Sequence, residues 1–241
     1  MIPAAFEYVR PDSVEQALAE LADPDAKAIA GGHSLLPLMK LRLARPSLLV
    51  DLDGLDLRGV SVDGDTIRLG ALTTYDELLS LDASVPLPAA LRDCANAVGD
   101  VQVRNAGTVG GGLAHADPAS DFAAGAIAVG ATLVLQSPAG TREVAAADFF
   151  VGPFTTLLKQ QELLVELRVP VRGERSAYVS FDDPASGYPL AGAAVCGDAV
   201  GLTGVAAHPL AAPDVLDKLG LDDYRRHLVT VAIDRARGAA R

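Results

Sequence analysis

The sequence of 241 residues contains no tryptophan, and only 5% of its residues are aromatic. Positive charge is also scarce: 20 lysines and arginines stand against 31 aspartates and glutamates, a formal net charge of −11 at pH 7. Nucleic-acid-binding domains present a basic face, often with aromatic side chains that stack on bases. The composition therefore argues against a nucleic-acid partner. Half of the residues are hydrophobic, which is ample for a large core.

Long apolar runs are missing as well. No stretch approaches the roughly 20 apolar residues that a membrane-spanning helix requires. The first residues show neither the basic nor the apolar region of a secretory signal. We therefore expect no membrane span and a cytoplasmic location.

Metal-ligating residues are few and scattered. The only cysteines, Cys94 and Cys196, lie far apart and form no metal-binding spacing. The four histidines show no ligand spacing either. We therefore expect reduced cysteines and no metal site, with Cys94 a core residue of a helix over about 87–98.

Glycine, by contrast, is concentrated in two segments. The 30–34 segment reads Ala-Gly-Gly-His-Ser and lies between a predicted strand at 26–30 and a predicted short helix at 35–41. Ser34 is the expected N-cap of that helix, because a serine oxygen can accept from the first free amides. Glycine permits positive φ and close approach of the backbone to a ligand. Its amides then form one side of an anion-binding site, although an ordinary glycine-rich turn remains the alternative.

The second glycine segment, 108–112, reads Thr-Val-Gly-Gly-Gly. We interpret the stretch around it, 102–121, as a loop that leads into a helix at about 122–131. Successive exposed amides before a helix N-terminus bind anions, and two such segments suit a dinucleotide pyrophosphate. Neither segment matches the Walker A loop or the G-x-G-x-x-G pattern, which disfavours a Rossmann site. The residues predicted to contact the ligand are Ala30, Gly31, Gly32, His33, Ser34, Thr108, Val109, Gly110, Gly111 and Gly112.

Hydrophobic periodicity predicts an α+β fold with two lobes, at about 1–53 and 54–172. Capping boxes at 13–16 and 74–77 begin two helices. Further strands are predicted at 47–52, 60–69 (a hairpin), 132–135, 141–144 and 162–169. After a charged linker at 172–175, we expect a small C-terminal α/β domain. Its predicted elements are a short three-stranded sheet at 178–181, 191–196 and 200–206, and helices at 213–219 and 222–236.

The two glycine segments, with their order and flanking residues, resemble those of the FAD-binding medium subunits of molybdenum hydroxylases, the carbon monoxide dehydrogenase and xanthine dehydrogenase type. The resemblance covers about the first 190 residues and returns at 223–228. It implies a two-lobed FAD-binding domain of the PCMH type over 1–172 and a shortened flavoprotein C-terminal domain over 173–241.

The resemblance also implies FAD as the cofactor and adds three residues to its site. Asp121 lies where the family binds FAD through an acidic side chain, Leu164 where it makes an apolar or backbone contact, and Tyr188 where it places an aromatic ring near the isoalloxazine. The residues themselves leave alternatives open: Asp121 can begin a helix, Leu164 can be a core strand residue, and Tyr188 can belong to a turn.

The function implied is electron transfer within an oxidoreductase complex. Substrate would be oxidised on a large molybdopterin subunit, and electrons would pass through the clusters of a small iron–sulfur subunit to the FAD held here, then to an external acceptor. Two isolated cysteines cannot hold an iron–sulfur cluster, so partners are required. No catalytic residue is predicted. Two departures from the family concern affinity: Gly112 replaces its usual Ser or Asn, and Ser180 its frequent Lys.

Two alternatives remain at this stage. One is a stand-alone flavin reductase of the same wider fold, although no convincing Ser or Glu proton donor occurs in the C-terminal part. The other is a structural or assembly subunit that has kept the shape and lost FAD.

Overall fold

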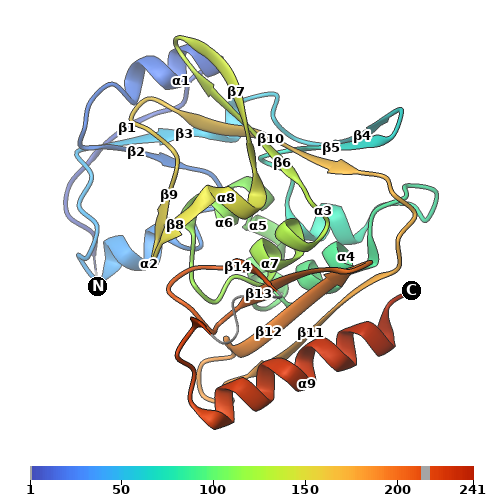
Figure 1. Ribbon diagram of the computed structural model, residues 1–241. Helices are drawn as coiled ribbons and strands as arrows, with labels where there is room; N and C mark the ends of the chain where they lie inside the picture. The colour runs from blue at the N-terminus through green and yellow to red at the C-terminus, as the bar shows by residue number, and fades with distance from the viewer. Residues whose placement is uncertain (1, 213–217) are drawn as a thin grey trace.

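A computed structural model describes residues 2–212 and 218–241, and it shows an α+β chain built on three main sheets (Figure 1). The N-terminal sheet is parallel, with strand order β1-β3-β2. Its elements are β1 (Glu7–Val9), α1 (Val14–Glu20), β2 (Ala26–Ile29), α2 (Leu35–Lys40), β3 (Leu48–Asp51) and the short 3-10 helix η1 (Leu52–Gly54). Helix α1 begins as expected, because the Ser13 side chain accepts from the amide of Gln16.

The central sheet is antiparallel, with strand order β4-β5-β10-β6-β7. Its strands are β4 (Val60–Asp63), β5 (Thr66–Gly70), β6 (Thr132–Ser137), β7 (Gly140–Ala145) and β10 (Leu163–Pro170). Both predicted hairpins are confirmed. The strand β10, distant in sequence, lies between them and joins them into one sheet, which local pattern could not predict.

Short helices lie between the central sheet and the C-terminal sheet (Figure 1). They are α3 (Tyr75–Leu79), α4 (Ala89–Ala97), α5 (Val101–Ala106), α6 (Val109–His115), α7 (Asp121–Ala128) and α8 (Ala146–Phe149), followed by the small hairpin β8 (Phe150–Gly152) and β9 (Thr155–Thr156). Helix α7 is the centre of this layer, because every residue from Phe122 to Ala128 is buried. Its small alanines and glycine allow elements to approach it from several sides.

The C-terminal sheet is antiparallel, with strand order β11-β12-β13-β14. Its strands are β11 (Ser176–Asp182), β12 (Pro189–Cys196), β13 (Ala199–Thr203) and β14 (Leu210–Ala212), and helix α9 (Asp223–Ala239) covers it. The expectation of three strands is therefore wrong, because β14 adds a fourth. The predicted helix at 222–236 is confirmed, and the one at 213–219 falls mostly outside the described residues.

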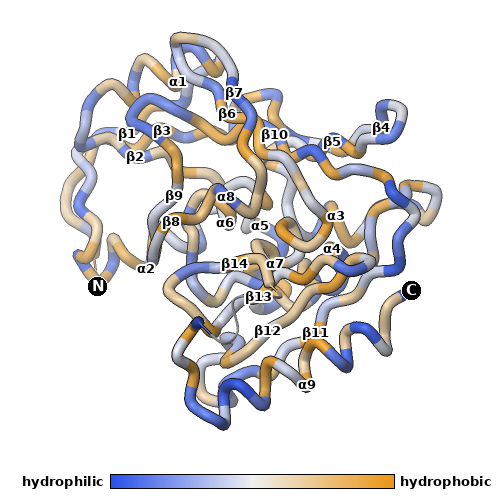
Figure 2. Tube along the Cα trace, in the orientation of Figure 1, coloured by the Kyte–Doolittle hydropathy of each residue, from blue (hydrophilic) through white to orange (hydrophobic). Residues whose placement is uncertain are grey.

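Helix α9 is two-sided, as its alternating colours show in Figure 2. Val229, Ala232, Ile233 and Ala236 are buried on the sheet, while polar residues face outward. No helix within the described ranges is long and apolar enough to span a membrane.

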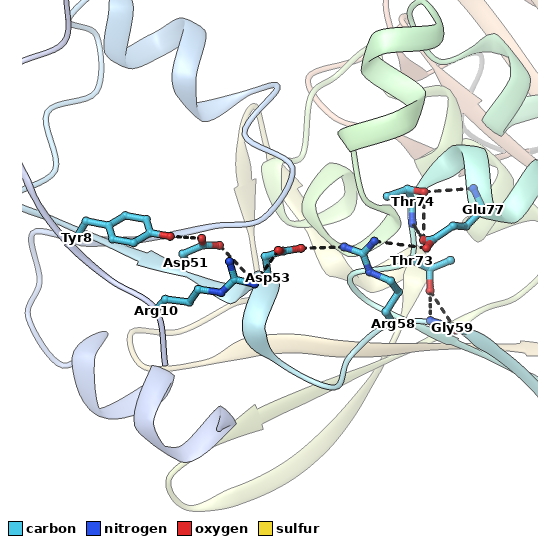
Figure 3. A network of polar contacts seen from close by, with 9 residues as sticks. All are labelled: Tyr8, Arg10, Asp51, Asp53, Arg58, Gly59, Thr73, Thr74 and Glu77. Atoms are coloured by element: carbon cyan, nitrogen blue, oxygen red, sulfur yellow. Dashed lines mark hydrogen bonds and ion pairs between the residues drawn. The ribbon is translucent and has the colours of Figure 1, made fainter. Parts of the chain in front are cut away.

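An interlobe network of polar side chains connects the N-terminal sheet to α3 (Figure 3). We define it as Tyr8, Arg10, Asp51, Asp53, Arg58 and Glu77. Arg58 is its link, since it pairs with Asp53 at 2.9 Å and with Glu77 at 3.4 Å. Glu77 completes the predicted capping box with Thr74, which forms an isolated β-bridge with Thr108. The network thus runs from the N-terminal sheet toward the 108–112 segment.

Candidate functional site

The stretch 102–121 is mostly helical, so its interpretation as a loop is wrong. Three capping residues explain the difference. Asp100 accepts from the amide of Val103 at the start of α5, and Thr108 and Ser120 do the same for α6 and α7. Each cap satisfies one of the amides that have no partner within the first turn of its helix. The caps offset the poor helix propensity of the three glycines.

The glycines of the 108–112 segment are required by packing. A Cβ on Gly110 would lie 2.5 Å from the Cβ of Ala71, and a Cβ on Gly112 would lie 2.2 Å from the hydroxyl oxygen of Tyr75. Only Gly111 is exposed, and a Cβ there would meet the hydroxyl oxygen of Thr108 at 2.7 Å. This segment is therefore the glycine-rich first turn of a helix, and its backbone packs closely against neighbouring residues.

The amides of the same segment already have partners within the protein. Gly110 donates to the Ala71 carbonyl at 2.9 Å, Gly111 to the Thr108 hydroxyl at 3.1 Å, and Gly112 to the Thr108 carbonyl at 3.0 Å. The Val109 amide donates to the Thr73 carbonyl at 2.9 Å. The expectation that these glycines offer free amide donors is wrong. What remains is the hydroxyl of Thr108, a residue that is only 5% exposed. This oxygen accepts from the Gly111 amide, and the hydroxyl proton is left to donate.

The 30–34 segment has the free amides that the other segment lacks. Within the described part of the chain, the amides of Gly31, Gly32, His33 and Ser34 donate no hydrogen bond. Gly32 has a φ of +73°, a conformation that favours glycine. Ser34 occupies the N-cap position of α2 but makes no capping hydrogen bond, so its hydroxyl is also available. Half-buried Ala30 and exposed His33 complete the segment.

The two glycine segments lie against one another. A Cβ on Gly31 would lie only 1.9 Å from the carbonyl oxygen of Ala106, just before the second segment. A Cβ on Gly111 would lie 3.8 Å from the Cβ of Ala30. The free amides and the Thr108 hydroxyl therefore belong to one site.

Asp121 is the first residue of α7, although Ser120 rather than Asp121 caps the helix. The Tyr178 hydroxyl, from β11, donates to Oδ1 of Asp121. The pKa of Asp121 is raised to about 6, mainly because the carboxyl group is buried. The hydrogen bond from Tyr178 lowers it, and the charges of Asp182 and Asp117 raise it. Asp121 is thus a carboxylate that is ionised at neutral pH yet poorly solvated.

Tyr188 lies in the turn before β12 and is 56% exposed. Its carbonyl accepts from the Asp183 amide at 2.9 Å, so it does serve the turn. Partial burial, with the charges of Asp117 and Asp121, raises the pKa of its hydroxyl, which places the side chain in the electrostatic field of Asp121. Its ring remains free to contact a ligand.

Three further residues that the sequence singled out, one leucine and two cysteines, are all buried. Leu164 is 6% exposed within the core around α7, which is the alternative left open for it. Cys94 is fully buried in the same core, as expected. Cys196 is a second free, buried thiol and donates to Glu174 at 3.5 Å. Over the described ranges, no group of His, Cys, Asp and Glu side chains could hold a metal ion.

The sequence did not single out Tyr178, Tyr75 or Ala106, although each touches a predicted site residue. Each lies in an ordinary strand or helix pattern, so no local signal marks it. Their roles come from long-range contacts.

The groups found in these segments are of the kinds that bind phosphates and hydroxyls. The unpaired amides and the hydroxyls of Ser34 and Thr108 can donate hydrogen bonds to an anion. The Asp121 carboxylate can accept hydrogen bonds from hydroxyl groups. Residues 4–172 match the family described as "FAD binding domain in molybdopterin dehydrogenase".

Individual relatives match over most of the chain. The carbon monoxide dehydrogenase medium chain of Hydrogenophaga pseudoflava is 44% identical over 203 residues, which cover 81% of this chain and 70% of that protein. The glyceraldehyde dehydrogenase medium chain of Sulfolobus acidocaldarius is 40% identical over 201 residues, with the same coverage. A structure of reconstituted CO dehydrogenase from Oligotropha carboxidovorans superposes with a TM-score of 0.91 at 34% identity, covering 100% of this chain and 99% of that chain.

Proposed function

Because the chain belongs to the family of FAD-binding domains of molybdopterin dehydrogenases, we propose that the 30–34 segment and the start of α6 hold the FAD pyrophosphate between them. The observation that carries this proposal is the run of amides from Gly31 to Ser34, which find no partner among the described residues, in a segment whose Gly31 packs directly against Ala106 beside the second glycine segment. Such amides bind a phosphate without help from net charge, which in this chain is −11.

Family membership confirms several predictions made from the sequence. The chain is an FAD-carrying oxidoreductase subunit of the molybdenum hydroxylase type, and its α+β fold is that of a CO dehydrogenase medium subunit. Neither alternative, the stand-alone flavin reductase or the structural subunit without FAD, is favoured by these relatives.

The residues present fit FAD. The amides of Gly31, Gly32 and His33, with the Ser34 hydroxyl, would hold one phosphate. The Thr108 hydroxyl and the positive end of α6 would hold the other. The glycines of the second segment would act by keeping the backbone bare, since Gly111 alone among them is exposed and their amides are occupied.

Further residues would act on the rest of the cofactor. Asp121 would accept hydrogen bonds from hydroxyls of FAD, and the exposed ring of Tyr188 would lie beside the flavin. Leu164 would act through its backbone or as a wall of the core, because its side chain is buried. When bound, FAD supplies the electron-transfer chemistry. The chain binds it, orients it and limits its contact with water.

We further propose that residues 1–172 form the FAD-binding unit and 173–241 a C-terminal unit that rests on it. The partners would be a large molybdopterin subunit and a small iron–sulfur subunit in the cytoplasm. Cys94 and Cys196 are separate, buried thiols, so this chain would receive electrons from clusters held elsewhere.

A binding experiment tests the site. FAD is titrated into the FAD-free protein, and binding is followed by the change in flavin fluorescence. We expect one FAD per chain for the wild type and none for Gly111→Val, whose side chain would cover the exposed backbone between the segments. Stoichiometric flavin in Gly111→Val would contradict the proposed site. Gly238→Val is the matched control and should retain FAD. Gly238 is an exposed residue of α9, and no atom lies within 4 Å of its Cβ position.

The partnership needs a separate experiment. We expect the tagged chain, expressed with its gene neighbours, to co-purify with a molybdopterin protein and an iron–sulfur protein. A chain that turns over substrate as a monomer would contradict this part of the proposal.

A further inference from the structure

The hydrogen bond from Tyr178 to Asp121 joins the C-terminal sheet to the start of the central helix α7. Tyr178 is on β11 and Asp121 is the first residue of α7, and the two residues are 57 positions apart. Tyr178 is 8% exposed, and burial raises the pKa of its phenol well above the ordinary value, so the hydroxyl keeps its proton and acts as a donor.

The sheet is shaped to deliver this hydroxyl. A Cβ on Gly192 of β12 would lie 2.3 Å from the Tyr178 hydroxyl oxygen, so only glycine leaves room for it there. The Tyr178 amide is also held, by a hydrogen bond of 3.3 Å to the Asp93 carboxylate. The aromatic side chain is therefore fixed both at its backbone and at its tip.

The same face of the sheet docks closely on the residues around Asp121. A Cβ on Gly201 would lie 2.1 Å from the Ala124 carbonyl oxygen of α7. The Gly204 amide and the Thr203 hydroxyl both donate to the Pro118 carbonyl, at 2.9 and 3.0 Å. The position of Tyr178 relative to Asp121 is thus set by a rigid interface.

The charges around Asp121 make this hydrogen bond important. The ionisable groups that face it are acids, phenols and a thiol: Asp117, Asp182, Tyr75, Cys94, Tyr178 and Tyr188. No cation of the described chain pairs with Asp121. Among the described residues, Tyr178 is the one whose side chain donates a hydrogen bond to the Asp121 carboxylate.

We propose that Tyr178 is a positioning residue for cofactor binding, which holds the Asp121 carboxylate ionised and turned so that it can accept from a hydroxyl of FAD. This inference rests on the proposed role of Asp121 in the FAD site. It gives the C-terminal sheet a direct part in binding a cofactor whose phosphates are held by the other two lobes.

The consequence is a pH-dependent affinity. FAD hydroxyls that donate to Asp121 favour its ionised form, so affinity should fall as the pH drops through the pKa of about 6. Removal of the Tyr178 hydroxyl removes a group that lowers this pKa. The loss of affinity should then begin at higher pH.

The test is an FAD titration of FAD-free protein across about pH 5 to 9, a range that brackets a carboxyl pKa near neutrality. Tyr178→Phe should weaken FAD binding about 10-fold near neutral pH, as expected when a hydrogen bond to a charged group is lost. The midpoint of the pH profile should move up, and affinity should largely recover at the alkaline end. Tyr224→Phe, at a tyrosine of α9 that is 64% exposed, is the control and should leave the midpoint in place.

A second variant covers the case in which Tyr178→Phe does not fold. Gly192→Ala displaces the Tyr178 hydroxyl instead of deleting it, and should move the midpoint in the same direction. Asp121→Asn should bind FAD more weakly and without the pH dependence. An equal loss of affinity at every pH in Tyr178→Phe, or an unmoved midpoint, would overturn the role of Tyr178 alone. A wild-type protein that binds no FAD at any pH would overturn the proposed site and this inference together.

Discussion

The two glycine segments look alike in sequence and differ in what their backbones do. In the 30–34 segment, the amides from Gly31 to Ser34 have no hydrogen-bond partner in residues 2–212 and 218–241. In the 108–112 segment, the amides from Val109 to Gly112 all donate to neighbouring oxygens. The 30–34 segment therefore supplies free amide donors. The 108–112 segment supplies one capping hydroxyl, and its backbone packs closely against neighbouring residues.

The comparison teaches that a glycine cluster has two separate physical uses. Glycine leaves amides accessible where the chain turns away from regular structure, and it allows close packing where the chain is helical. Both uses are needed here, because the Gly31 backbone lies directly against Ala106 at the end of α5. The following variants separate the two uses.

The largest effect is expected for Gly31→Ala. The added Cβ would lie 1.9 Å from the Ala106 carbonyl oxygen, so the two segments must separate. We expect the free energy of unfolding to fall by more than about 3 kcal/mol, beyond the usual cost of overpacking, together with loss of FAD. Urea denaturation measures the first effect. Gly238→Ala is the control, since no atom lies within 4 Å of its Cβ position, and it should be neutral or stabilising by about 0.5–1 kcal/mol. Equal stabilities of the two variants would show that the segments are not in contact.

The next effect concerns the carboxylate that complements the two segments. The pKa of Asp121 is raised from 3.8 to about 6, so the folded state favours the protonated form. Its stabilising contribution is present below about pH 4 and is lost as the pH rises through about 6. Asparagine cannot ionise and still accepts from Tyr178. Asp121→Asn should therefore stabilise the FAD-free protein by about 1–3 kcal/mol near pH 8 and not near pH 4. Thermal unfolding at both values is the measurement, and an equal shift at each would refute the assignment.

A matched pair of hydroxyl variants compares the segments most directly. Thr108 caps α6 and Ser34 makes no capping hydrogen bond. Thr108→Val should lower the free energy of unfolding by about 1 kcal/mol, the usual cost of a lost cap, and should also weaken FAD binding. Ser34→Ala should leave stability within about 0.5 kcal/mol and weaken only FAD binding. Chemical denaturation and FAD titration of both proteins distinguish these outcomes. A stability loss in Ser34→Ala as large as that in Thr108→Val would contradict the distinction.

The smallest effect is expected in the interlobe network, which connects the N-terminal sheet to α3. Arg58 and its partners Asp53 and Glu77 are all about half exposed, with side-chain exposures of 45%, 51% and 42%. Exposed ion pairs contribute about 0.2–1 kcal/mol and weaken in salt. A double-mutant cycle of Arg58→Ala with Asp53→Ala should give a coupling in this range that falls at high salt. A larger coupling that persists in salt would mean that the network is a main support of the site.

Local sequence was sufficient for much of the fold. The N-cap at Ser13, the capping box at 74–77, both hairpins and the terminal helix were predicted because their signals lie within a few residues: a cap, a turn or a repeat of buried side chains. The capping box predicted at 13–16 is only half formed, because the Gln16 side chain accepts from the amide of Asp12 instead of that of Ser13. Local sequence failed at α5 and α6, where glycine content indicated a loop. Two causes favour helix there. The caps at Asp100 and Thr108 are local, so the sequence could have revealed them. Packing against Ala71 and Tyr75 depends on residues that are distant in the sequence.

For this protein, the sequence by itself determined which residues could form a cofactor site, because glycine, serine, threonine and aspartate were already concentrated in the right order. The tertiary structure decided which of them are free to act. In the fold, the amides of 109–112 donate hydrogen bonds to neighbouring oxygens, whereas those of 31–34 have no partner among the described residues. The fold also brings Tyr178, from the C-terminal sheet, to Asp121. The physical reason is that a donor serves a ligand only if no nearer acceptor takes it, and the nearer acceptors here are carbonyls and hydroxyls brought into place by the fold.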